Sequence, residues 1–310
     1  LARLNAHTRL GKGYESLKLL SKLRQYESNK ENSNVSAMTR YAYNRVINAL
    51  YYSIPGDHEE WRIASDPVST SAFFLNAMYR DGIPATENTV KNLLKLYGKK
   101  IMKDNKNKTS RDIMATLDHA EELIINTSYG GFCGHGKVPV GNTSLRELVK
   151  ACCLGYQDQK ALKILLDAKE KYGVNITAEP WEPLIYHLTK RGQMDAAKDS
   201  ITLMTNAGIV PSTNILDAVA TGYLNQGDGP EAVEKLEGFF NYSKIRPAAS
   251  TLLKLLDSAL SETTVYGVKG VDIYQAQRIC SVIMSMYTNE ERCSVKMNVR
   301  ISTTNDEYRM

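Results

Sequence analysis

The fold is decided by a pattern that occurs twice, as WEPLIYHLTKRGQMDAAKDSITLM at residues 181–204 and as LDAVATGYLNQGDGPEAVEKLEGF at residues 216–239. Each copy contains two runs of apolar residues at helical spacing, separated by a glycine, Gly192 or Gly227. Each matched residue of the first copy lies 35 positions before its equivalent in the second copy. The matched residues of the first copy are Trp181, Leu184, Ile185, Leu188, Gly192, Ala197, Ile201 and Met204. A fixed period of about 20 to 50 residues is typical of repeat proteins. The pattern therefore predicts tandem helix-turn-helix units.

Weaker copies of the pattern extend over most of the chain. The first-helix spacing recurs at Tyr43, Val46, Ile47 and Leu50; at Val90, Leu93, Leu94 and Tyr97; at Leu145, Leu148, Val149 and Cys152; and at Leu252, Leu255, Leu256 and Ala259. We therefore predict an all-α fold of about six helix pairs stacked as a solenoid. The expected organisation is a partial repeat helix and linker at 1–38, two diverged repeats at 39–126, an inserted glycine-rich loop at 127–142, four repeats at 143–288 and a non-helical tail at 289–310.

Local signals predict where individual helices start. Asp66 followed by Pro67 predicts a helix start, because aspartate is favourable at the N-cap and proline at the first helical position. Ser144 and Glu147 have the spacing of a capping box. Residues 14–27 are interpreted as the second helix of a unit whose first helix is absent.

The C-terminal part departs from the regular pattern. Residues 261–270 are expected to form a long loop, followed by a helix with Cys280 on its apolar face. From Cys293 to Ile301 apolar and polar residues alternate, a period that suits a strand. Two interpretations remain for this tail: it is disordered, or it adds a strand to the sheet edge of a partner.

Composition and charge limit the function classes. The net charge of +5 suits nucleic acid and also many protein-binding surfaces. The five cysteines form no disulfide framework, so reduced thiols are expected. No apolar run approaches the roughly 18 residues of a membrane span, so no membrane partner is expected. Residues 1–13 carry Arg3, Arg9 and Lys12 without an acid, as the end of an organellar presequence does.

The sequence predicts no enzyme, cofactor, metal site or small-molecule substrate. Residues 131–138, GFCGHGKV, follow the spacing of a phosphate-binding loop until Val138, where that loop needs a hydroxyl for Mg²⁺. Cys133 and His135, taken with Cys152 and Cys153, lack the paired spacing of a structural zinc site. No histidine has the neighbours of a catalytic triad.

The segment YNRVINAL at residues 43–50 resembles the first-helix signature of pentatricopeptide repeat proteins. The 35-residue period and the ending at residues 204–211 are similar to the second helix and closing turn of that family. The tetratricopeptide pattern, with its period of about 34 residues, is not found. The resemblance covers most of residues 39–287. It implies a right-handed α-solenoid that works in mitochondria or chloroplasts and often binds single-stranded RNA.

In that family each repeat reads one base through two residues, one after the first-helix aromatic and one that closes the repeat. Carried over by position, the resemblance places the first-helix readers at Asn44, Lys91, Arg146, Glu182, Asp217 and Leu253. It places the closing residues at Thr86, Gly141, Thr177, Ser212 and Ala248. Only Asn44 fits the family pattern, and Glu182 and Asp217 put carboxylates into a groove meant for RNA. We therefore expect RNA to be held mainly through its phosphates.

Residues 90–111 carry the strongest positive charge of the chain, with eight basic residues against Asp104 alone. Lys91, Lys95 and Lys99 share one helical face, which neutralises phosphates by counterion release. The alternative is a solvated helix face followed by a lysine-rich loop. The predicted RNA-contacting set is Asn44, Thr86, Lys91, Lys95, Lys99, Lys100, Lys103, Arg146, Thr177 and Ser212.

Two functions follow from these observations. The first is an organellar RNA-binding repeat protein that acts in RNA processing, stability or translation. The second is a repeat scaffold that holds protein partners in a large assembly, such as a mitochondrial ribosome. The expected location is the mitochondrion or the chloroplast.

Overall fold

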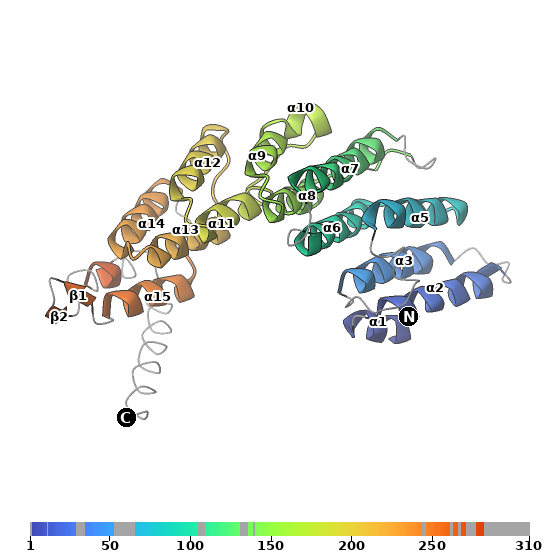
Figure 1. Cartoon of the computed structure of the whole chain (residues 1–310), viewed down its shortest axis with the longest axis horizontal. Coiled ribbons are helices and arrows are strands. Elements are labelled where there is room, and N and C mark those ends of the chain that lie inside the picture. The colour runs from blue at the N-terminus through green and yellow to red at the C-terminus, as the bar shows by residue number, and fades with distance from the viewer. Residues whose placement is uncertain are drawn as a thin grey trace, which may run out of the picture. The chain divides into compact units, whose positions relative to one another are not determined.

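The structure is a computed structural model that describes residues 2–10, 12–28, 35–52, 66–104, 109–130, 136–138, 140–243, 246–260, 263–265, 268–270 and 277–281. The chain divides into two compact units, Leu1–Pro183 and Leu184–Met310, each of which we describe by itself. Almost every element in both units is an α-helix (Figure 1).

The first unit is built from helix pairs. Its helices are α1 Ala2–Arg9, α2 Gly13–Ser28, α3 Val35–Tyr52, α5 Pro67–Arg80, α6 Glu87–Asp104, α7 Ser110–Tyr129, α8 Asn142–Leu154, α9 Asp158–Leu166 and α10 Ala168–Tyr172. The first helices of successive pairs, α3, α6 and α8, pack side by side in chain order. The second helices α5, α7 and α9 pack against them. The first-helix row therefore presents one surface that successive repeats share.

The second unit continues the same pattern. It contains α11 Glu182–Lys190, which starts at the end of the first unit, then α12 Met194–Asn206, α13 Thr213–Asn225, α14 Gly229–Ser243 and α15 Ala249–Leu260. Helix α13 contacts α12, α14 and α15. The predicted all-α fold of stacked helix pairs is thus confirmed.

The two clear sequence copies form α11–α12 and α13–α14. The matched apolar residues are buried in both copies, apart from Phe239, which is half-buried. Gly192 and Gly227 have φ angles of 73° and 78°, a left-handed conformation that side chains with a Cβ atom rarely adopt. The glycines in the sequence pattern therefore form the turns inside each helix pair.

The predicted start of α5 is confirmed. The Asp66 carboxylate accepts hydrogen bonds from Val68 N and Ser69 N, and Pro67 occupies the first helical turn. These bonds satisfy backbone donors that have no partner within the helix.

The predicted capping box at Ser144 and Glu147 is wrong. Helix α8 starts earlier, at Asn142, and its N-cap Gly141 supplies no side-chain cap. Both Ser144 and Glu147 are buried inside the helix, where they face neighbouring helices. A capping box exists instead at the start of α7, between Thr109 and Asp112.

The N-terminus also differs from expectation, because the helix thought to be absent is present. Helix α1 precedes α2, and both contact α3. Leu4 of α1 is buried, and the Thr8 hydroxyl donates hydrogen bonds to Leu4 O and to Arg45 O. The short basic segment that suggested a presequence thus forms part of the folded unit.

The C-terminal region brings two further differences. Residues 261–270, expected as a loop, contain strands β1 Thr263–Val265 and β2 Val268–Gly270, which pair antiparallel with Thr263 opposite Gly270. In the helical residues 277–281, Cys280 is exposed and Ile279 is buried, so the predicted apolar face is shifted by one residue. The alternating tail from Cys293 to Ile301 lies outside the described residues. None of the described helices is both long and apolar enough to cross a membrane.

Candidate nucleic-acid interface

The structure brings the first-helix reader positions of the first unit onto one row of helices. Asn44, Lys91 and Arg146 lie on α3, α6 and α8, each directly after a buried residue of the first-helix pattern. The side-chain Oδ1 of Asn44 is buried and has no hydrogen-bond partner among the described residues. Asn44, a predicted reader, thus has an acceptor without a partner among the described residues.

Two other reader positions are occupied by bonds within the chain. Arg146 Nε lies 3.6 Å from Glu182 Oε2, so readers of consecutive repeats form an ion pair with each other. Asp217 Oδ1 accepts hydrogen bonds from Ala248 N at 3.0 Å and from Thr251 Oγ1 at 2.7 Å, which caps the start of α15. Asp217 therefore supports the next repeat.

The predicted closing residues are also used for structure. Thr86 N and Thr86 Oγ1 both bond Thr89 Oγ1, at 3.3 Å and 3.2 Å, next to the start of α6. Ser212 is the N-cap of α13, where its hydroxyl accepts a hydrogen bond from Ile215 N. These residues shape helix starts, and no described contact of theirs indicates base recognition.

A recurring link joins three of the described first helices to the repeat that follows. It starts from the first residue of α6, α8 and α13, four positions before the reader. The Glu87 carboxylate accepts from Thr143 Oγ1 at 2.6 Å, and Thr213 Oγ1 donates to Arg246 O at 3.2 Å. Asn142 Oδ1 accepts from Thr177 N at 2.9 Å. We call these contacts the inter-repeat links.

The basic residues of the run at 90–111 do not all face the same surroundings in the structure. Lys99 Nζ donates to Leu50 O at 3.2 Å and to Tyr51 O at 2.6 Å, at the C-terminal end of α3. Lys100 Nζ pairs with the Asp66 carboxylate at 3.3 Å. Lys103 is exposed, and the side chains of residues 106 and 108 lie outside the described residues. Lys99 and Lys100 thus have partners within the chain.

Four cations lie on the adjacent helices α6 and α8 of two consecutive repeats: Lys91 and Lys95 of α6, and Arg146 and Lys150 of α8. We call them the cationic cluster. Arg146 is also ion-paired with Glu147 and Glu182. Burial lowers the pKa of Lys95, and the positive charges of the other three lower it further, against the opposing effect of the buried Glu147. A lysine among like charges is stabilised by an anion.

Lys150 was missed from the sequence, although a signal for it existed. It follows Arg146 by four residues, as Lys95 follows Lys91, so the two lysines occupy the same position in consecutive repeats. Lys150 lies outside the basic run at 90–111, and few charged residues are near it in the sequence. The repeat register would have found it.

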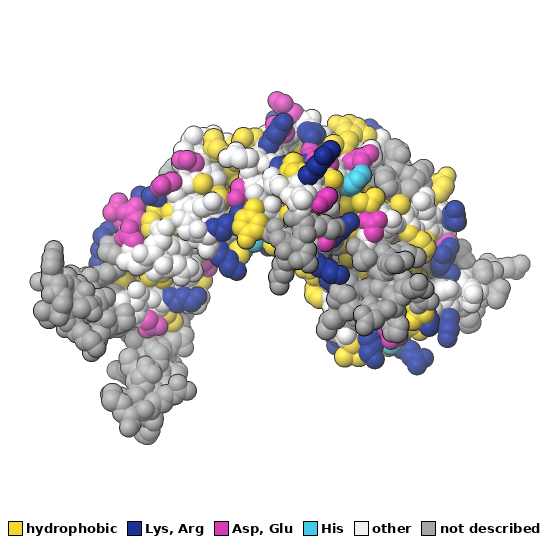
Figure 2. Space-filling view, viewed as in Figure 1, with side chains coloured by type: hydrophobic (Ala, Val, Ile, Leu, Met, Phe, Trp, Pro, Cys, Tyr) yellow, Lys and Arg dark blue, Asp and Glu magenta, His cyan; other side chains and the backbone are white. Residues whose placement is uncertain are grey.

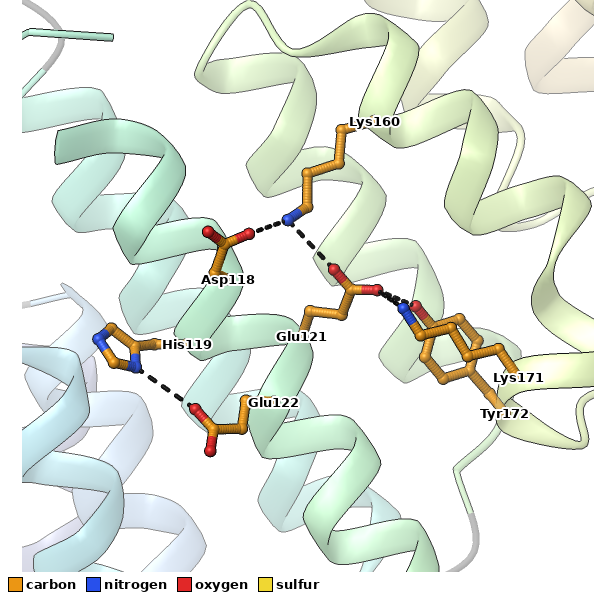
Figure 3. Close-up of polar contacts among 7 residues, drawn as sticks. All are labelled: Asp118, His119, Glu121, Glu122, Lys160, Lys171 and Tyr172. Carbon is orange, nitrogen blue, oxygen red and sulfur yellow. Dashed lines mark hydrogen bonds and ion pairs between the residues drawn. The ribbon is translucent and has the colours of Figure 1, made fainter. Parts of the chain in front are cut away.

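A second polar cluster, on the second helices, was also missed (Figure 3). Glu121 of α7 accepts hydrogen bonds from Tyr172 Oη at 2.6 Å and from Lys171 Nζ, and Lys160 Nζ lies 3.1 Å from its other oxygen. Lys160 also pairs with Asp118. Burial acts to raise the pKa of Glu121, but these hydrogen bonds outweigh it and lower the pKa to about 2.

This second cluster borders a cavity of about 370 Å³ lined by residues of α7, α9 and α10. Its cations already neutralise Glu121 and Asp118, and burial together with the hydrogen bond to Glu121 raises the pKa of Tyr172 above its usual range. We interpret this cluster as a polar contact that holds α7 against α9 and α10.

The described residues contain no group of three metal-ligating side chains. Cys152 and Cys153 are buried, and burial raises the pKa of the Cys152 thiol to about 12, as expected for a packed cysteine. Cys133 and His135 lie outside the described residues. So does most of the segment 131–138, whose sequence follows the spacing of a phosphate-binding loop.

No protein-family model and no curated protein match the sequence. Solved structures do match the fold. The chain is similar to the PPR domain of Arabidopsis thaliana protein-only RNase P 1 in complex with tRNA, at 12% identity and a TM-score of 0.40, over 64% of this chain and 95% of that one. It is also similar to the pentatricopeptide repeat protein PPR10 from maize, at 15% identity and a TM-score of 0.37, over 91% of this chain and 43% of that one. The structure of PPR10 with an 18-nt psaJ RNA element gives 14% identity and a TM-score of 0.35, over 83% of this chain and 41% of that one.

Proposed function

We propose that the protein binds single-stranded RNA through its phosphates on the first-helix row of the first unit. The observation that carries this proposal is the placement of Lys91 and the half-buried Lys95 on α6, and of Arg146 and Lys150 at the equivalent positions of the adjacent helix α8. A fold that gathers like charges from two repeats incurs an electrostatic cost, which a bound polyanion removes. Phosphate contacts of this kind give affinity without base preference.

The charge distribution of the first unit supports an extended anionic ligand. Basic side chains are also visible over the part that holds α1 to α3 (Figure 2). In the sequence of this part, Arg3, Arg9, Lys12 and Lys22 are exposed. The intrachain bonds of Arg146, Glu182 and Asp217 argue against a base code read in every repeat. We therefore propose binding with weak sequence preference.

The test is the affinity of the purified chain for a pool of random single-stranded RNA across salt concentrations from about 50 to 300 mM. The logarithm of the affinity should fall linearly with the logarithm of the salt concentration. The variant Lys91→Glu/Lys150→Glu should weaken binding, and the slope should become shallower by about 0.7 for each phosphate that the protein no longer neutralises.

Lys163→Glu/Lys169→Glu is the matched control, because it makes the same charge change at exposed positions on α9 and α10. Equal loss of binding in both variants would show a general charge effect and no interface on the first-helix row. Absence of binding at low salt would reject RNA as the ligand.

The scaffold function is the second candidate. It is favoured by the Asp217 contacts to Ala248 and Thr251, which turn a reader position into framework. On this alternative the repeats of the second unit hold a protein partner in an organellar assembly. The proposed organelle, mitochondrion or chloroplast, is tested by imaging the full-length protein with a C-terminal fluorescent tag. The proposal assigns the protein no catalytic step.

A further inference from the structure

An aromatic pair stands beside the cationic cluster, at the C-terminal end of α3. The rings of Tyr51 and Tyr52 lie edge to face, with centroids 5.0 Å apart and an interplanar angle of 77°. Tyr51 is half-buried, whereas Tyr52 is 61% exposed. An exposed ring packed against a half-buried one offers an apolar surface to a ligand.

The position of this pair is held by α6. Lys99 donates two hydrogen bonds to the carbonyls of Leu50 and Tyr51, which ties the last turn of α3 to the neighbouring repeat. Both carbonyls lie in the last turn of α3. Lys99, expected as a phosphate contact, thus positions the aromatic pair.

Tyr51 also links the pair to the cationic cluster. Lys95 Nζ lies 5.9 Å from the centroid of the Tyr51 ring, within the range of a cation–π interaction. Burial, and then the charge of Glu147, raises the pKa of Tyr51, so the phenol is neutral and adds no repulsion toward an anion. The exposed ring of Tyr52 is therefore packed on a ring that lies close to a cation.

We propose that Tyr52, supported by Tyr51, is a stacking platform for an unpaired base whose phosphate is neutralised by the cationic cluster. This inference rests on the proposed RNA-binding function and specifies its ligand further. Proteins that bind single strands without base preference combine a positive groove with aromatic platforms. A base inside a duplex is already stacked on both faces, so the site would select single strands.

The platform is tested with two probes of equal phosphate number: an oligouridylate of about twelve nucleotides and its abasic counterpart. The wild-type chain should bind the oligouridylate more tightly. Tyr52→Leu should weaken oligouridylate binding about tenfold, as expected for loss of one stacked base, without changing the affinity for the abasic probe or the salt slope. Tyr52→Phe should retain the wild-type affinity.

Tyr79→Leu is the matched control, because Tyr79 is 53% exposed on α5, a second helix. Unchanged oligouridylate binding by Tyr52→Leu would overturn the platform, and so would an equal loss with the abasic probe. If Lys91→Glu/Lys150→Glu still weakened binding in either case, the phosphate interface would stand without the platform. If the wild-type chain bound neither probe, both the interface and the platform would be rejected.

Discussion

Asn142 and Thr177 join two consecutive repeats through one amide side chain. Asn142 Oδ1 accepts a hydrogen bond from Thr177 N at 2.9 Å, and its Nδ2 donates to Asn175 O at 3.3 Å. The two groups of the amide thus satisfy the backbone on both sides of the turn that precedes α11. A residue expected to read RNA, Thr177, is instead held by its backbone in the packing between repeats.

We expect Asn142→Ala to lower the free energy of unfolding by about 2 kcal/mol, because it removes two hydrogen bonds with a usual net value of about 1 kcal/mol each. Urea denaturation followed by circular dichroism measures the change. Asn142→Asp keeps the acceptor for Thr177 N and loses the donor to Asn175 O, so it should cost less. An alanine variant as stable as the wild type would show that this link contributes nothing.

Asp217→Ala should destabilise the second unit by about 1–2 kcal/mol, because it removes a helix cap. Stability is lost because Ala248 N and Thr251 Oγ1 would no longer have their hydrogen-bond acceptor. Asp195 supplies the comparison: its side chain is 98% exposed, and Asp195→Ala should change stability by less than about 0.5 kcal/mol. Similar effects in thermal denaturation of both variants would contradict the capping role.

Glu121 should make stability depend on pH in the acidic range. Its pKa falls from the usual 4.5 to about 2 in the folded chain, so its ionised form is favoured by folding. The resulting stability is complete above about pH 4.5 and is lost as the pH falls toward 2. Wild type and Glu121→Gln should therefore differ most near neutral pH and converge in acid. Glu122→Gln alters a more exposed neighbour, and should show no such convergence.

Lys99→Met tests whether Lys99 acts on the fold or on RNA. It leaves the carbonyls of Leu50 and Tyr51 without their donor, which should cost about 1–3 kcal/mol in a partly buried site. The salt slope of RNA binding should be unchanged, because no phosphate contact is removed. If the salt dependence of RNA binding became shallower and stability did not change, Lys99 would be a phosphate contact.

The sequence predicted helices wherever apolar spacing and glycine turns agree, since both are local properties. The 35-residue period placed Trp181 and Leu216 in equivalent buried sites. Asp66 was found as an N-cap because the cap and the following proline are adjacent in sequence. Local chemistry of this kind determines helix starts and turns before any tertiary contact forms.

Contacts between repeats could not be predicted in the same way. Ser144 and Glu147 match a capping box, but packing of α8 against α6 buries both and moves the helix start to Asn142. The ammonium of Lys99 finds carbonyls about fifty residues earlier in the chain, a pairing that no spacing rule contains. The family resemblance located the reader positions, but the partners of Arg146 and Asp217 became visible only in three dimensions.

The link from Glu87 to the start of α8 has a consequence for protein engineering. A Cβ atom at Gly141 would lie 2.4 Å from Glu87 Oε1, so the carboxylate occupies the space that a side chain at the N-cap would fill. Thr143 donates to the same oxygen. The interchangeable module of this chain is therefore larger than one period. A repeat grafted with its boundary at a helix start would lose the partner of its inter-repeat link. A graft that includes both residues of the link would keep this contact.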